Sequence, residues 1–73
     1  MNEEKLEKLA EIEGYSNYMD MLGEATNDSI AKGICTNVGC DYTTDVEPDS
    51  DGGWCEECNA NTVHSCLILA GVI

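Results

Sequence analysis

Two short cysteine motifs, CTNVGC at residues 35–40 and CEEC at residues 55–58, decide the fold of this chain. Within each motif a tight turn can direct both sulfur atoms at one point, and the 14 residues between the motifs let the two turns face each other. Cys35, Cys40, Cys55 and Cys58 then provide the four ligands of a closed tetrahedral site. The spacing predicts one tetrathiolate metal site, and we expect its ion to be Zn(II) rather than iron.

Disulfide bonds are the other common use of clustered cysteines, and the sequence argues against them. The chain has five cysteines, so a closed disulfide framework would leave one unpaired. Its first residues are charged and no apolar segment follows them, so we expect no secretory signal and a cytoplasmic location, where structural disulfides are rare. We expect the fifth cysteine, Cys66, to be a small buried apolar residue, and His64 to be a partly exposed strand residue.

The residues beside the metal-binding cysteines suit tight turns. Such turns commonly need a residue with positive φ, which glycine adopts freely and which asparagine and aspartate tolerate better than most residues. Gly39 and Asp41 flank Cys40, and Asn59 follows Cys58. We expect positive φ at these flanking residues.

The length of the chain explains why a metal site would matter. At 73 residues it is one small domain, and a domain of this size rarely gains enough stability from its apolar core alone. No apolar run approaches the ~20 residues of a membrane-spanning helix. The sequence therefore predicts a single domain that is held together by its metal and has no membrane association.

Residues 1–28 have the apolar spacing of helices. The first pattern is Leu6, Leu9 and Ala10, and the second is Tyr15, Tyr18, Met19, Leu22 and Ala25. Gly14 separates the two patterns, so we expect two short helices with a break there, or one longer bent helix. Asn2 and Ser16 are the N-cap residues that we expect for them.

Residues 33–73 have the pattern of a three-stranded zinc ribbon. Apolar and polar side chains alternate from Tyr42 to Val46, Pro48 ends this strand, and the DSDGG sequence at 49–53 has turn chemistry. The apolar run from Thr62 to Ala70 predicts a further strand. The expected fold class is a small metal-bound α+β domain, in which the helical segment 1–28 and the ribbon 33–73 form one compact unit.

Most of the chain resembles a family of short zinc-ribbon proteins from bacterial and phage-like genomes. The residues that carry this resemblance are Gly33–Cys35, Gly39–Thr43, Gly53–Cys58 and Leu69–Ile73, together with the helical stretch Glu13–Ser16 and the pairs Met21–Leu22 and Glu24–Ala25. The resemblance implies zinc on Cys35, Cys40, Cys55 and Cys58. It implies little about biochemistry, because such proteins are mostly of unassigned function. Cys66 departs from the pattern of this family, in which we expect a small non-ligand residue at this position.

Charge is the strongest evidence on function. The chain has 15 acidic residues against three lysines and no arginine, so its formal net charge is -12. No lysine or arginine follows Lys32, while residues 41–57 hold seven acidic residues. Zinc ribbons often bind nucleic acid, but binding to phosphate backbones depends on lysine and arginine. We therefore expect no direct contact with nucleic acid.

The sequence leaves several functions open. We expect no enzymatic activity, because a closed tetrathiolate site leaves the metal no open position. Our first hypothesis is a structural zinc protein that acts as an acidic protein–protein interaction or regulatory adapter for a partner with a basic surface. One alternative is a rubredoxin-like iron electron carrier, since Trp54 precedes a cysteine pair, although the spacing of the first pair is wider than usual. Another is a nucleic-acid-associated zinc ribbon or a DNA-mimic inhibitor. The apolar residues 67–73, if they form an uncovered strand, also predict a homodimer.

Overall fold

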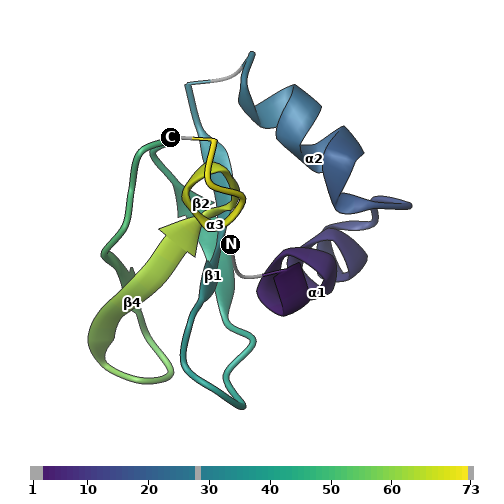
Figure 1. The fold of residues 1–73 in the computed structure, drawn as a ribbon. Coiled ribbons are helices and arrows are strands. Elements are labelled where there is room, and N and C mark those ends of the chain that lie inside the picture. The colour runs from purple at the N-terminus through teal and green to yellow at the C-terminus, as the bar shows by residue number, and fades with distance from the viewer. Residues whose placement is uncertain (1–2, 28, 73) are drawn as a thin grey trace.

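Three helices lie beside a four-stranded antiparallel sheet in the computed structural model (Figure 1). The structure describes residues 3–27 and 29–72. In chain order the elements are α1 (Glu3–Glu13), α2 (Tyr18–Ala25), β1 (Ala31–Cys35), β2 (Thr43–Val46), β3 (Gly53–Cys55), β4 (Ala60–Ser65) and α3 (Cys66–Leu69). The expectation of a small α+β fold with N-terminal helices followed by strands is confirmed.

The break between the first two helices lies where the sequence places it. Gly14 ends α1 with a φ of +86°, a conformation that glycine adopts without steric cost. The N-cap of α2 is Asn17 and not the expected Ser16, because the Asn17 side chain accepts a hydrogen bond of 3.1 Å from the backbone N–H of Asp20. The other expected cap, Asn2, lies outside the described residues.

The buried face of α2 agrees with the expected one at Leu22 and Ala25, and Tyr15 and Tyr18 pack against the same core, but the expectation for Met19 is wrong. Met21, Leu22 and Ala25 are buried, whereas Met19 is 65% exposed. The helix begins at Tyr18, so the residues that follow it at helical spacing are 21, 22 and 25, and Met19 lies off this stripe. The expected stripe of α1, by contrast, is confirmed, since Leu6, Leu9 and Ala10 are buried.

The sheet has four strands, and not the three that were expected. Its order is β2-β1-β4-β3, with every neighbouring pair antiparallel. The additional strand arises because β1, which begins at Ala31, pairs with β2 on one side and β4 on the other. The residues just before Cys35 are therefore central in the sheet.

The C-terminal apolar run is a strand only in its first part. Residues 62–65 lie in a strand as expected, but β4 begins two residues earlier, at Ala60. Cys66–Leu69 form helix α3, so the expected strand there is wrong. Ser65 is the N-cap: its hydroxyl accepts a hydrogen bond of 3.2 Å from the Ile68 N–H and donates one to the Pro48 carbonyl. Because α3 packs on α1, α2 and β1, it offers no strand edge for the expected pairing between copies.

The apolar residues form two cores that meet at β1. The larger core lies among the helices and contains Leu6, Leu9, Ala10, Met21, Leu22, Ala25, Ala31, Ile34, Cys66, Leu67 and Leu69. The smaller core contains Cys35, Cys55 and Val63, with Cys40, Tyr42, Val46 and Cys58 packed against it. Ile34 and Cys35 are consecutive residues of β1, so they lie on opposite faces of the strand, Ile34 in the larger core and Cys35 in the smaller one.

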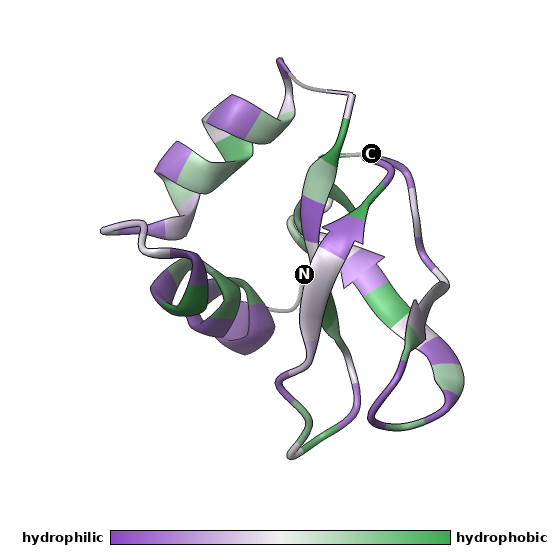
Figure 2. Ribbon diagram, turned by 180° about the vertical axis from the view of Figure 1, so that it is seen from behind, coloured by the Kyte–Doolittle hydropathy of each residue, from purple (hydrophilic) through white to green (hydrophobic). Residues whose placement is uncertain are grey.

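Figure 2 shows that α1 and α2 each carry both hydrophilic and hydrophobic residues, as amphipathic helices do. None of the described helices is long and apolar enough to cross a bilayer.

Candidate metal centre

The four predicted cysteines come from two loops at one end of the sheet. Cys35 ends β1 and Cys40 lies in the first cysteine loop, residues 36–41; Cys55 ends β3 and Cys58 lies in the second cysteine loop, residues 56–59. Because β1 and β3 both pair with β4, their ends are held close together, and both loops project from the same end of the sheet (Figure 1). The tertiary fold thus gathers all four predicted site residues.

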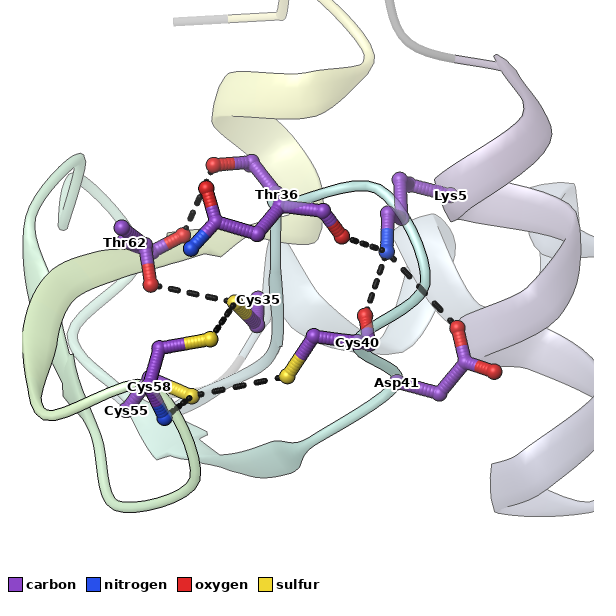
Figure 3. A network of polar contacts seen from close by, with 9 residues as sticks. Lys5, Cys35, Thr36, Cys40, Asp41, Cys55, Cys58 and Thr62 are labelled. Carbon is purple, nitrogen blue, oxygen red and sulfur yellow. Dashed lines mark hydrogen bonds and ion pairs between the residues drawn. The ribbon is translucent and has the colours of Figure 1, made fainter.

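The sulfur atoms are arranged as a tetrahedral ion requires. All four Sγ atoms lie within 4.8 Å of one another, with 3.8 Å between Cys35 and Cys58 and 3.7 Å between Cys40 and Cys55. A Zn–S bond of about 2.3 Å in a regular tetrahedron corresponds to a sulfur–sulfur distance of about 3.8 Å. Figure 3 shows the four sulfur atoms facing a common centre, and none of these cysteines is in a disulfide. The donor set and its geometry fit a tetrathiolate metal ion.

The local backbone supports this arrangement. Gly39 has a φ of +84° and Asn59 a φ of +53°, as expected for residues beside the second cysteine of each pair. The same expectation for Asp41 is wrong, because among the described non-glycine residues only Asn59 has positive φ. In the second loop the backbone N–H of Cys58 donates a hydrogen bond of 3.3 Å to the sulfur of Cys55, which closes the turn between the two cysteines.

Burial and polar neighbours set the electrostatics of the cluster. Cys35 and Cys55 are fully buried, and Cys40 and Cys58 are partly buried. Burial opposes ionisation of Cys35, but hydrogen bonds from Thr62, whose Oγ1 lies 3.0 Å from the sulfur, from the Asn37 backbone and from neighbouring cysteines lower its pKa to about 7. The backbone of Tyr42 favours the Cys40 thiolate, yet burial and the adjacent thiols raise the pKa of Cys40 to about 12. Four thiolates therefore need a cation among them to coexist at neutral pH.

The fifth cysteine and the histidine lie away from the four-sulfur cluster. Cys66 is fully buried in the helical core, where burial raises the pKa of its thiol. His64 is half-buried on β4, opposite Ile34 of β1. Neither residue belongs to the four-sulfur cluster. The expectations of a buried Cys66 and a partly exposed strand position for His64 are confirmed.

Lys5 is a contributor to the site that sequence reasoning missed. From α1 its Nζ donates to the carbonyl oxygens of Asn37, at 2.9 Å, and Cys40, and lies 3.7 Å from a carboxylate oxygen of Asp41 (Figure 3). Its side chain is only 12% exposed. A lysine in the first turn of a helix opposes the helix dipole, and this unfavourable position is the one signal in the sequence. Lys5 joins the helical half to the first cysteine loop.

Replacing Lys5 tests this connection. Lys5→Met keeps the length and apolar stem of the side chain but removes both hydrogen bonds to the loop, so we expect unfolding free energy to fall by about 1 kcal/mol. We also expect weaker metal retention against a competing chelator, because the loop that holds Cys40 becomes less ordered. Urea denaturation and chelator competition measure the two effects.

Lys8→Met is the matched control, because it makes the same charge change on the same helix at an exposed position. It should alter stability by less than about 0.5 kcal/mol. Equal losses in the two variants would show that overall charge, and not the contact with the loop, is responsible.

Comparisons with family models, with curated proteins and with solved structures find no match to this chain. What the site does must therefore be inferred from its own geometry and charge. Four clustered sulfur donors make this a candidate structural metal centre.

Proposed function

We propose that this chain is a structural zinc protein of the zinc-ribbon type that acts as an acidic adapter for a partner with a basic surface. The main observation in support of this proposal is the cluster of four cysteine Sγ atoms, which lie within 4.8 Å of one another. Zn(II) suits such a set because it has no redox chemistry and prefers closed tetrahedral sites of thiolates in structural roles. One ion would be held by Cys35, Cys40, Cys55 and Cys58, and would fasten the two cysteine loops to each other.

Two features favour the ribbon type. The four sulfur donors come in two pairs, each carried by the end of a strand and the loop that follows it. The central strands β1 and β4 pair antiparallel and bring the two loops together. A site with all four positions taken by protein sulfur has no place for substrate or water, so the role we propose is structural and not enzymatic.

The adapter role is supported by charge. The net charge of -12 becomes more negative when four thiolates hold one divalent cation. Two of the three lysines are engaged within the protein, Lys5 with the first cysteine loop and Lys32 with Glu13 at 3.3 Å and Asp45 at 3.0 Å. Such a surface repels phosphate backbones and accelerates association with basic proteins. We place this interaction in the cytoplasm, where the thiols stay reduced.

Metal analysis of the purified chain tests the metal half of this proposal. We expect one zinc ion per chain and a colourless protein, from cells grown with both zinc and iron. Cys66→Ala, which leaves the cluster intact, should keep the same stoichiometry. A red protein with one iron per chain would replace the zinc assignment with the rubredoxin-like one, since iron also binds four thiolates.

The same purified protein, immobilised, tests the adapter half. It should retain a basic protein at low ionic strength and release it as salt increases, because exposed charges are screened within about 10 Å at 0.1 M salt. Retention of no partner at low salt would overturn the adapter role while leaving the zinc site unaffected.

A further inference from the structure

A groove is lined by residues of α1, of the turn that follows it and of the start of α2. Figure 1 shows the turn that connects the two helices. Its volume is about 630 Å³. The lining residues that matter to its chemistry are Glu7, Glu11, Tyr15, Ser16, Asn17 and Tyr18. The groove therefore combines two carboxylates with two aromatic rings, and it is separate from the cysteine cluster.

The two carboxylates of this groove are available to an external cation. Glu7 and Glu11 are exposed and lie one turn apart on the same face of α1. Within residues 3–27 and 29–72, the ion pairs use other acidic residues: Lys5 with Asp41, and Lys32 with Glu13 and Asp45. Neither groove carboxylate is neutralised by an ion pair among these residues.

The two tyrosines give the groove a fixed aromatic wall. Tyr15 and Tyr18 are half-buried and pack against the helical core, so their rings are already ordered before anything binds. The cap hydrogen bond from Asp20 to Asn17 fixes the start of α2 beside them. Ordered aromatic rings attract cations through their faces, at little cost in conformational entropy.

We propose that this groove binds an arginine side chain of the basic partner. A planar guanidinium can pair with the carboxylates of Glu7 and Glu11 and stack on a tyrosine ring, whereas a lysine ammonium is a compact and more strongly hydrated charge. This inference rests on the proposed adapter function and identifies where the partner docks. It does not depend on which metal the cysteines hold.

The test is a titration of the full-length, metal-loaded chain with a short capped peptide of alternating arginine and glycine, followed by NMR. We expect amide shifts concentrated at residues 7–18, and tighter binding than for the matching lysine peptide. Glu7→Gln combined with Glu11→Gln should weaken binding about tenfold, which corresponds to the loss of two exposed ion pairs. Asp49→Asn with Asp51→Asn is the matched control, since it removes the same charge from the exposed β2–β3 loop and should change affinity less than twofold.

Each of the other possible results would contradict the proposal that this groove binds arginine. Equal weakening by the two double variants would mean that overall charge, and not this groove, attracts the peptide. Equal binding of the arginine and lysine peptides would remove the guanidinium preference. Failure of the arginine peptide to bind at low salt would also contradict arginine binding in this groove. If the immobilised chain nevertheless retains a basic protein, the adapter function stands and the partner docks at another surface.

Discussion

Replacing Cys55 with serine is expected to abolish stoichiometric metal binding and to unfold the strand half of the protein. Cys55 is fully buried in the smaller core, and its Sγ lies 3.7 Å from that of Cys40. Structural zinc supplies about 10–16 kcal/mol of apparent binding free energy, which is as large as the whole net stability of a typical domain. Metal analysis together with far-ultraviolet circular dichroism measures both losses.

Cys66→Ala is the control for this variant, because Cys66 is equally buried but lies in the helical core. It should keep one metal ion and the β signal. A strong chelator added to the unmodified protein should reproduce the effect of Cys55→Ser. A β signal that persists after verified metal removal would contradict the view that metal holds the sheet together.

The second large effect is expected at Gly33, at the centre of the sheet. An added Cβ there would lie 2.8 Å from Cγ2 of Val46, 2.9 Å from Cγ1 of Val63 and 3.1 Å from the carbonyl oxygen of His64. Val46 and Val63 come from the strands on either side of β1, so glycine lets their side chains close over it. Gly33→Ala should lower the unfolding free energy by about 2 kcal/mol, the usual cost of overpacking a core. Urea denaturation of the metal-loaded protein measures this.

Gly23→Ala on α2 provides the matched comparison, because a Cβ at Gly23 meets nothing within 4 Å. Alanine is the better helix former, so this variant should gain about 0.5–1 kcal/mol. The same chemical change is thus expected to have opposite signs in two environments. A neutral Gly33→Ala would show that the two valines move aside at little cost.

The candidate site was largely predictable because its determinants are local. The pairs Cys35–Cys40 and Cys55–Cys58 are close in sequence, so the turn between their members follows from residues such as Gly39 and Asn59. The break at Gly14 is local in the same sense. Lys5 was not predictable, because its partners Asn37 and Cys40 are more than 30 positions away in the chain and nothing local indicates which loop α1 approaches.

The sequence by itself determined the four sulfur donors, the order of helices followed by strands and the excess of acidic residues, since each depends on residue type and short spacing. Only the tertiary structure decided the conformation of the C-terminal apolar run, the presence of the fourth strand and the burial of Met21 rather than Met19 on α2. Residues 66–69 are apolar enough for either a strand or a helix, and the Ser65 cap together with burial against α1 and α2 selects the helix. Periodicity identifies an apolar segment, but which neighbours cover it depends on contacts between residues far apart in the chain.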